Sequence, residues 1–348
     1  MSILWSIIII GILILVHEFG HFVTAKKNDV QVDEFSLGMG PKLFDIEKGD
    51  TVYTLRILPI GGYVRMAGMD EGEKDGEGEK ESFVSGDDPR GFNKKTVLQR
   101  MSIIFAGPLM NFVAAIVFFI IAYMGVGTPS NENVVGQVLP DQPAALAGLE
   151  TGDRVTAING QAIGTWEEMV KIIHQSPDQE LTMTVNRGEE IKIFRVVPER
   201  DPESEIGLIG VTTSMEKKGF LEAASLGVTQ TYEFTKLLIM SIVQMITGVI
   251  KPDLAGPVGI VSMVGEVSRL GIGSILTFAG ILSINLGLIN LFPIPALDGS
   301  RLVFLALEGL RGRPLAPEKE NFIHLIGFVL LMGLMLMVTY QDILRLFQ

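Results

Sequence analysis

The sequence predicts a polytopic α-helical membrane protein with four transmembrane helices, a membrane-associated β-hairpin or sheet, and an inserted extracytoplasmic α/β domain. Three observations predict this class. Hydrophobic residues make up 47% of the 348 residues, and the mean hydropathy is +0.38. Four stretches approach the roughly 20 apolar residues that a helix needs to cross a bilayer. Between the second and third stretches, short strand-like runs alternate with turn residues and one helical pattern, as in a small globular domain.

The four apolar stretches are residues 3–25, 101–124, 274–297 and 322–340. Basic residues follow the first stretch, precede the second, and lie between the third and fourth. Because Lys and Arg favour cytoplasmic loops, these positions face the cytoplasm, and both termini and the inserted domain lie outside. The basic residues are Lys26, Lys27, Arg90, Lys94, Lys95, Arg100, Arg301, Arg311, Arg313 and Lys319.

Four regions follow along the chain. Residues 1–125 form an N-terminal membrane part, 126–200 the inserted domain, 201–273 an extracytoplasmic amphipathic or linker region, and 274–348 a C-terminal membrane part. Segment 220–250 is awkward, because its most apolar portion is shorter than a span. We expect it to form an amphipathic helix on the outer face, since a fifth span would place the later arginines outside.

Segment 31–65 reads as a β-hairpin that follows the first span, which the family resemblance described below makes re-entrant. Strand-like residues 42–47 and 51–57 flank a Lys48-Gly49-Asp50 turn, while Gly61 and Gly62 allow close backbone approach. The residues alone leave open a small hairpin in the cytoplasm. Residues 70–90, dominated by Glu, Asp, Lys and Gly, read as a solvated acidic loop.

Charge and cysteine content exclude several classes. The net charge is −12, and phosphate binding needs clustered Lys and Arg, so no nucleic-acid partner is expected. The chain has no cysteine, so it has neither disulfides nor thiolate metal ligands. The first span lacks a basic region before it and a small-residue cleavage site, so we interpret it as a retained helix rather than a signal peptide.

The first span ends in His17-Glu18-Phe19-Gly20-His21. On a helix, His17 and His21 project from one face, and Glu18 lies beside them, within reach of a water at a metal site. Such a pattern in a soluble helix could be a chance match on a solvated face. Ionisable side chains at membrane depth are costly, so here they indicate function. About 14 residues from Ile3 correspond to roughly 21 Å of helix, which places the histidines in the cytoplasmic third of the bilayer.

A catalytic zinc usually has three protein ligands, and Asp298 is the best candidate for the third. It closes the segment 290–298 at the cytoplasmic end of the third span, where Pro293 and Pro295 interrupt the helix. Unwound backbone at this depth must be buried in protein or line a watery cavity, and Asn290 offers an amide there to hold a substrate backbone. Without the histidine motif, Asp298 would read as an interfacial helix cap. The other histidines are His174, read as a surface residue, and His324, read as an interfacial residue or an alternative ligand.

The inserted domain resembles a PDZ domain of the kind attached to bacterial membrane proteases. Its residues 147–160 contain the pattern AGLxxGDxVxxING, and strands are expected at 134–139, 181–185 and 191–197 with helices at 143–149 and 166–175. A generic small α/β domain is the alternative. PDZ domains bind extended peptides by adding a strand.

Taken together, the chain resembles the site-2 protease family of intramembrane zinc metalloproteases, in the bacterial regulator-of-sigma-E protease branch with one PDZ domain. HExxH in the first span, the PDZ-like insert and NxxPxPxLDG in a later span carry the resemblance, which covers almost the whole chain. It implies that His17, His21 and Asp298 bind Zn²⁺ and that Glu18 is the catalytic base. Ser300 departs from the pattern, because a second glycine is expected there. Further matching segments are 38–41, 58–64, 105–111 and 256–260.

The resemblance implies an endopeptidase of the bacterial inner membrane. Its substrates would be single-span membrane proteins already shortened by another protease, such as anti-sigma factors or signal-peptide remnants. Segment 31–65 would clamp the unwound substrate. The alternatives are a membrane-anchored PDZ adaptor without proteolytic activity and a metal transporter. Glu18 favours the protease, because neither alternative needs a base beside the ligands, and transport needs a polar path across the whole bilayer.

Overall fold

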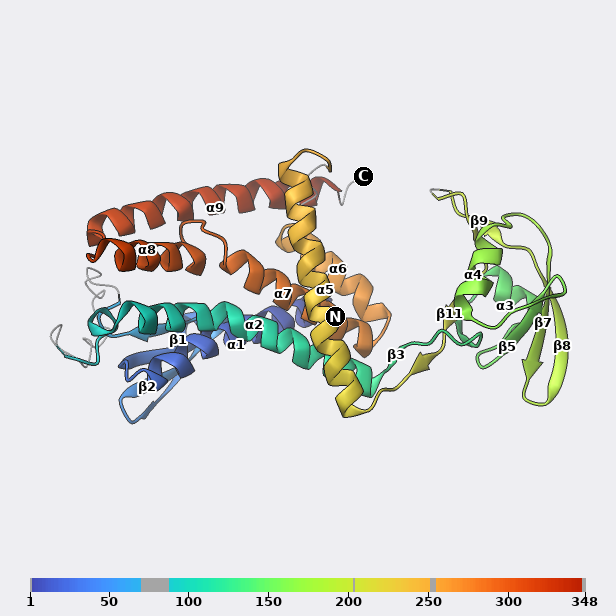
Figure 1. The fold of residues 1–348 in the computed structure, drawn as a ribbon, viewed down its shortest axis with the longest axis horizontal. Helices are drawn as coiled ribbons and strands as arrows, with labels where there is room; N and C mark the ends of the chain where they lie inside the picture. The colour runs from blue at the N-terminus through green and yellow to red at the C-terminus, as the bar shows by residue number, and fades with distance from the viewer. Residues whose placement is uncertain (1, 70–87, 203, 251–254, 346–348) are drawn as a thin grey trace. The chain divides into compact units, whose positions relative to one another are not determined.

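A computed structural model describes residues 2–69, 88–202, 204–250 and 255–345 of the chain (Figure 1). The chain divides into two compact units, one made of Met1–Ala122 with Phe220–Gln348 and the other of Tyr123–Gly219. Most of the expected acidic loop 70–90 lies outside the described residues. The first unit contains the membrane helices and the β-hairpin, and the second contains the inserted domain.

Four helices in the described part of the chain are long and apolar enough to cross a membrane. They confirm the four expected spans. The third helix ends at Asn290 and not at residue 297, because the segment with Pro293 and Pro295 cannot continue it. The four helices are α1 (Ser2–Lys27), α2 (Val97–Gly125), α7 (Ile272–Asn290) and α9 (Pro317–Arg345).

Small residues bring α1, α2 and α7 close together. A β-carbon at Gly20 in α1 would collide with the backbone oxygen of Ala106 in α2. A β-carbon at Gly287 in α7 would lie 3.0 Å from the backbone oxygen of Pro108 in α2. Helices in lipid associate through such close packing, because hydrocarbon gives apolar side chains no reason to leave it. The three backbones therefore approach one another at the level of the histidines.

The described part of the first unit contains three further α-helices, and the sequence predicted only the first of them. They are α5 (Phe220–Ile246), α6 (Pro257–Arg269) and α8 (Asp298–Arg311). Val264 of α6 belongs to the same apolar cluster as Ile9 and Leu13 of α1. The C-terminal part of region 201–273 is thus packed into the helical unit and is not a linker. At the start of α6, Gly259 donates its backbone N–H to Asp342 of α9 (N–Oδ2 2.8 Å).

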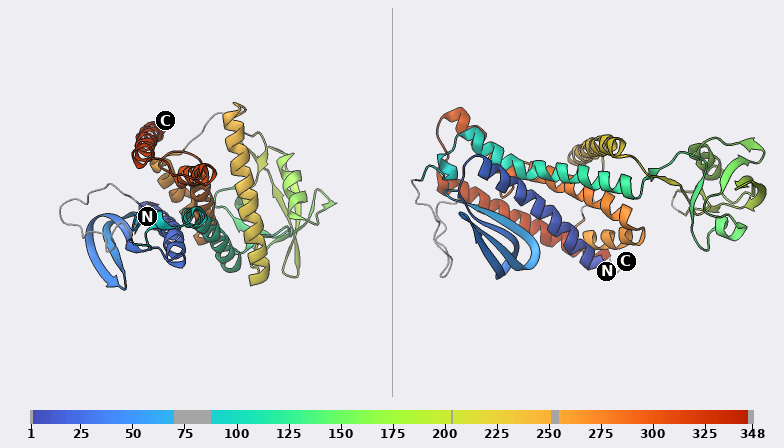
Figure 2. Two further views of the ribbon diagram at one scale, coloured as in Figure 1. Left: turned by 60° about the vertical axis from the view of Figure 1, so that its left-hand side comes forward. Right: turned by 90° about the horizontal axis from the view of Figure 1, so that it is seen from below.

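The expected hairpin is present as β1 (Val32–Lys48) and β2 (Thr51–Met66), closed by the pair Lys48 and Thr51. Its strand pairing is more complex than that of a simple hairpin. Residues 34–37 lie opposite 52–55 on one side and 62–65 on the other, so the two bent strands fold into a small sheet. Figure 2 shows this sheet alongside α1, which is the helix that β2 contacts most. The edge segment that contains Gly61 and Gly62 is thereby held near the histidine motif.

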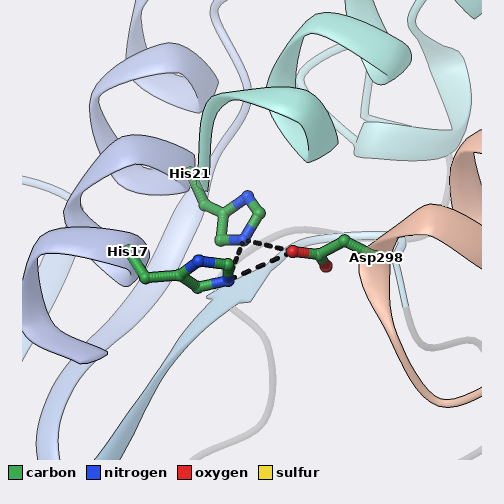
Figure 3. Close-up of side chains that lie close together, drawn as sticks. All are labelled: His17, His21 and Asp298. Carbon is green, nitrogen blue, oxygen red and sulfur yellow. Dashed lines mark hydrogen bonds and ion pairs between the residues drawn. The ribbon is translucent and has the colours of Figure 1, made fainter. Parts of the chain in front are cut away.

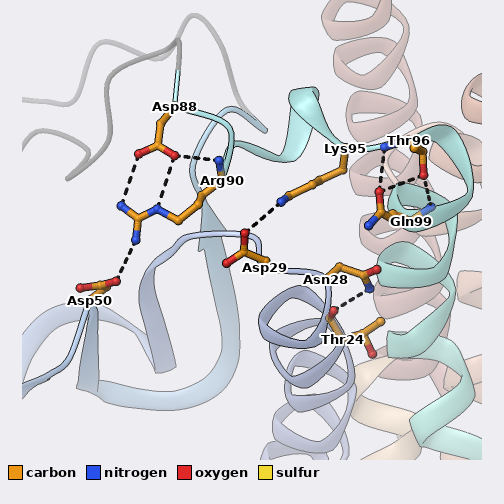
Figure 4. A network of polar contacts seen from close by, with 9 residues as sticks. All are labelled: Thr24, Asn28, Asp29, Asp50, Asp88, Arg90, Lys95, Thr96 and Gln99. Carbon is orange, nitrogen blue, oxygen red and sulfur yellow. Dashed lines mark hydrogen bonds and ion pairs between the residues drawn. The ribbon is translucent and has the colours of Figure 1, made fainter.

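Polar contacts tie the tip of the hairpin to the residues before α2 (Figure 4). Arg90 bonds Asp50 of the turn (Nη1–Oδ2 2.9 Å) and also Asp88. Lys95 lies 3.5 Å from Asp29, just after α1. Between them is a short 3₁₀ helix, η1 (Phe92–Lys94). These contacts are exposed and individually weak, but together they connect the end of α1, the sheet and the start of α2.

The second unit follows the strand and helix order expected for the PDZ-like domain. Its main sheet has the order β6-β5-β7-β8, and Gly148 ends the first helix in a left-handed conformation (φ 89°). The unit extends beyond the expected range 126–200, because β11 pairs with β4 and β12 pairs with β3. The helices are α3 (Pro143–Ala147) and α4 (Trp166–His174), and the strands are β3 (Thr128–Pro129), β4 (Val135–Val138), β5 (Arg154–Ile158), β6 (Gln161–Ala162), β7 (Leu181–Arg187), β8 (Glu190–Val196), β9 (Glu199–Arg200), β10 (Gly207–Leu208), β11 (Val211–Thr213) and β12 (Met215–Glu216).

Candidate metal centre

His17 and His21 project from one face of α1 and meet Asp298 at the first residue of α8 (Figure 3). Nε2 of His17 lies 3.1 Å from Oδ2 of Asp298, and Nε2 of His21 lies 3.4 Å from the same oxygen. The two Nε2 atoms are 3.2 Å apart. Residues that lie far apart in the sequence thus converge on one point.

Side chains and backbone of α2 hold both imidazole rings. Nδ1 of His21 lies 2.9 Å from the backbone oxygen of Ile103, to which it can donate. The amide of Asn111, which is fully buried, lies 3.1 Å from Nδ1 of His17. The contact to Ile103 leaves Nε2 of His21 free for a metal, and the side-chain nitrogen of Asn111 fixes the orientation of the His17 ring. Ser283 of α7 in turn donates its hydroxyl to the backbone oxygen of Asn111 (2.7 Å).

Sequence reasoning missed the contributions of Asn111 and Gly107. A β-carbon at Gly107 would collide with the imidazole of His21, so only glycine leaves room for this ring. Both residues lie in the segment 105–111, which carried part of the family resemblance. A buried amide inside an apolar span was the available signal for Asn111, since polar groups at this depth are costly unless they are used.

The remaining candidates lie as follows. Glu18 follows His17 on α1, and a β-carbon at Gly62 would lie 3.5 Å from its Cγ. Gly62 therefore lies beside the acidic side chain, and Gly61 precedes it with a φ of 94°. Asn290 is the last residue of α7, and the two prolines of segment 291–297 connect it to Asp298: Pro293 is exposed and Pro295 half-buried.

The other two histidines lie outside the cluster. His174 is the last residue of α4 in the second unit. His324 lies on α9, where its Nδ1 accepts a hydrogen bond from the backbone N–H of Ala296 (3.0 Å). Within the described residues, the grouping that could hold a metal ion consists of His17, His21 and Asp298.

The donor set fits a zinc ion. One donor atom from each of the three residues lies within 4.8 Å of the other two. Oδ2 of Asp298 is buried, has no hydrogen-bond partner and faces two imidazole nitrogens. Two imidazoles and one carboxylate are a common ligand set of catalytic zinc, which keeps a fourth position open. A cation would compensate the carboxylate charge that this arrangement buries.

Comparisons with known proteins identify the family of this chain. The model of Peptidase family M50 matches residues 5–334. The zinc metalloprotease RasP of Oceanobacillus iheyensis is 37% identical over 417 residues, which cover 98% of each chain. The regulator of sigma-W protease RasP of Bacillus subtilis is 37% identical over 413 residues, with the same coverage. A solved PDZ domain of an SdrC-like protein from Listeria monocytogenes matches 25% of this chain and 90% of its own, with 23% identity and a TM-score of 0.22.

The apolar helices, the converging donor set and these relatives define a zinc metalloprotease that works within a membrane. Its cofactor is Zn²⁺. The chain belongs to peptidase family M50, the site-2 protease family.

Proposed function

We propose that His17, His21 and Asp298 bind the zinc ion and that Glu18 is the general base of peptide-bond hydrolysis. The single observation that carries this assignment is the convergence of the three donor atoms from α1 and α8. The anchoring of both imidazoles by α2 supports it, because metal-ligating histidines need a partner at the other ring nitrogen.

The chemistry divides between the ion and the chain. Zinc supplies Lewis acidity, which polarises the scissile carbonyl and makes water acidic near neutral pH. Glu18 takes a proton from the attacking water and delivers it to the leaving amine. Its position next to His17 keeps the carboxylate beside the metal ligands without making it one of them.

Substrate binding would use the sheet edge and the segment before Asp298. A substrate helix satisfies its own amides, so it must unwind before hydrolysis, and an edge strand can replace the lost hydrogen bonds. The segment with Gly61 and Gly62 lies beside Glu18 and pairs with β1 on one side, which supports this role. Asn290, Pro293 and Pro295 would line the opposite wall, because they lead directly into Asp298.

The substrates would be single-span membrane proteins that a first extracytoplasmic cleavage has shortened, such as anti-sigma factors or signal-peptide remnants. The name of the Bacillus subtilis relative, regulator of sigma-W protease, supports the anti-sigma-factor class. The active site would lie toward the cytoplasmic side of the inner membrane, with both termini and the PDZ-like unit outside, as the basic residues indicate.

Glu18→Gln tests the assignment of the base. The variant should bind zinc stoichiometrically but lose roughly 10²- to 10⁴-fold in cleavage rate, which is the usual contribution of a positioned base. Membrane fragments that accumulate in cells with the variant and not with the wild type would identify substrates. A variant that cleaves at the wild-type rate would contradict the assignment.

The PDZ-like unit would act either as a steric gate or as a recruiter of substrates. Residues 130–214 can be excised, because the backbone N–H of Ser130 donates to the oxygen of Ser214 (2.9 Å) and the two cut ends therefore lie side by side. A gate predicts that the shortened enzyme cleaves full-length substrate. A recruiter predicts slower cleavage of trimmed substrate and no cleavage of the full-length form.

The proposed orientation can be tested by cysteine labelling, since the chain has no native cysteine. Cysteines at Lys27 and Arg313 should react with impermeant reagents only after the membrane is opened. A cysteine at Asn186 should react in intact spheroplasts. Labelling of Arg313→Cys from outside would mean that α5 crosses the membrane.

A further inference from the structure

The segment that delivers Asp298 contains an unusual backbone conformation. Between α7 and α8, Ala296 has a φ of 77°, in the left-handed region that side chains other than glycine rarely occupy. Such a residue persists only where its surroundings impose the conformation. Ala296 lies two residues before Asp298, so its backbone helps to decide where the carboxylate points.

His324 of α9 contacts this strained residue directly. The backbone N–H of Ala296 donates to Nδ1 of His324 over 3.0 Å, across 28 residues of sequence. Because Nδ1 accepts this hydrogen bond with its lone pair, it carries no proton, and a neutral ring carries its proton on Nε2. That nitrogen lies 3.8 Å from Oε1 of Glu320, and the ring of Phe304 packs edge-on at 5.6 Å. The imidazole is therefore held in one orientation.

A second contact fixes α9 to the same segment. Gly327, one turn after His324, packs so tightly that a β-carbon would collide with Pro295. The backbone of α9 thus lies directly against the residue before Ala296. The other buried residues of α9 among those described, Val338 and Asp342, lie near its far end, so these contacts hold the end that carries His324.

We propose that His324 is a positioning residue, which holds Ala296 in its left-handed conformation and thereby directs the carboxylate of Asp298 toward His17 and His21. The inference rests on the proposed role of Asp298 as a zinc ligand. His324 is not itself a ligand, since it lies outside the described metal cluster and uses Nδ1 on the backbone.

Three substitutions at one position test the proposal. The side-chain oxygen of asparagine can replace Nδ1 as the acceptor, whereas that of glutamine falls near Nε2, and alanine offers no acceptor. His324→Ala and His324→Gln should weaken zinc binding roughly 10- to 100-fold, as the loss of outer contacts to metal sites does. His324→Asn should remain near the wild type. The measurement is zinc affinity of the whole purified chain by competition with a chelator, with cleavage of a model substrate as a second readout.

A second-site variant separates positioning from general damage to the fold. Glycine adopts positive φ without strain, so Ala296→Gly should restore part of the zinc affinity in the His324→Ala background. Helix content and elution in detergent should match the wild type for every variant.

Four outcomes would overturn the proposal or the assignment on which it rests. Equal zinc affinity of His324→Asn and His324→Gln, whether lowered or not, would show that the accepted hydrogen bond is irrelevant. Absence of any rescue by Ala296→Gly would show that the left-handed residue is not the link. If Asp298→Ala retains zinc, the ligand assignment itself fails; if it loses zinc while all His324 variants keep theirs, only this inference fails.

Discussion

The two sides of the metal centre are built differently. On the histidine side, His17 and His21 belong to one continuous helix, both are buried, and α2 contacts the far nitrogen of each ring. On the carboxylate side, Asp298 begins a new helix after a non-helical segment, and it is only half-buried. A hydrogen bond from Ala296 to the distant α9 supports that segment.

This difference indicates how the site is preorganised. Closely packed helices have few alternative arrangements, so the two imidazoles are fixed before a metal binds. A segment without regular backbone hydrogen bonds has more alternatives, and binding must select one of them. The carboxylate side is therefore where small structural changes should alter metal affinity gradually, while a change that displaces an imidazole on the histidine side should abolish it.

Removal of a ligand on either side has the largest expected effect. His21→Ala and Asp298→Ala should both lose stoichiometric zinc and cleavage, because each leaves only two protein ligands. Metal analysis of the purified variants provides the measurement, with Glu18→Gln as the variant that keeps zinc. Stoichiometric zinc in Asp298→Ala, with its loss in His324→Ala, would mean that the wrong third ligand was assigned.

Two glycine-to-alanine substitutions compare the sides directly. In Gly107→Ala the new methyl group occupies the place of the His21 ring, which cannot retreat while its Nδ1 bonds Ile103, so zinc binding should be nearly lost. In Gly327→Ala the methyl group meets Pro295, and the non-helical segment can shift, so zinc affinity should fall but persist. Titrations with zinc in the presence of a chelator measure both. A greater loss in Gly327→Ala would reverse the comparison.

Removal of the buried amide of Asn111, on the histidine side, should have a smaller effect on zinc affinity. Asn111→Ala removes the partner of His17 Nδ1 and should lower zinc affinity roughly 10- to 100-fold. Asn111→Asp places a carboxylate oxygen where the amide nitrogen lies, so it can accept from Nδ1 of His17 and leave Nε2 free, and it serves as the matched control for the contact. Unchanged affinity in Asn111→Ala would show that helix packing alone fixes the ring.

Substitutions in the second unit are expected to have the smallest effect on zinc affinity. Burial alone would raise the pKa of Asp153, but hydrogen bonds from Arg187 and the amide of Glu150 hold it below its usual value. The carboxylate therefore stabilises the unit above about pH 4, the usual aspartate pKa, and this contribution is lost as the pH falls through the lower folded value. Asp153→Asn should destabilise the unit by about 1–3 kcal/mol at pH 7 and leave zinc affinity unchanged.

Hydrogen exchange of the whole chain measures that difference. Amides within Tyr123–Gly219 should be better protected from exchange in the wild type than in Asp153→Asn. This difference should have its largest value at neutral pH and decrease below about pH 4. A difference that grows on acidification would contradict the sign of the pKa shift. A change in zinc affinity would show that the second unit influences the metal centre.

Local patterns in the sequence were sufficient for much of the fold and for the metal cluster. The spacing of His17 and His21 on a helix, and the prolines before Asp298, are short-range signals with direct geometric meaning. The turn at Gly49 fixed the hairpin in the same way. Helices α6 and α8 were missed because both are too short and too mixed in composition to stand out beside full spans.

Long-range contacts could not be predicted in this way. Asn111 and His17 are separated by 94 residues, and the double register of β1 depends on a bend at Gly38 and Gly40 that brings distant halves together. Nothing in the sequence around His324 indicates that its ring accepts from Ala296. Tertiary packing decides these pairs, and a single sequence shows which residues are available but not which of them meet.

Helix α9 has a consequence for the response of the enzyme to its lipid. It is bonded near one end through His324 to Ala296 and near the other through Asp342 to Gly259. Eighteen residues separate these two contacts, which is roughly 27 Å of helix and close to the hydrocarbon thickness of a bilayer. A thicker or thinner bilayer changes the tilt that suits such a helix. Because one end of α9 supports the segment of Asp298, zinc affinity in vesicles should vary with acyl-chain length, and His324→Ala should remove that dependence.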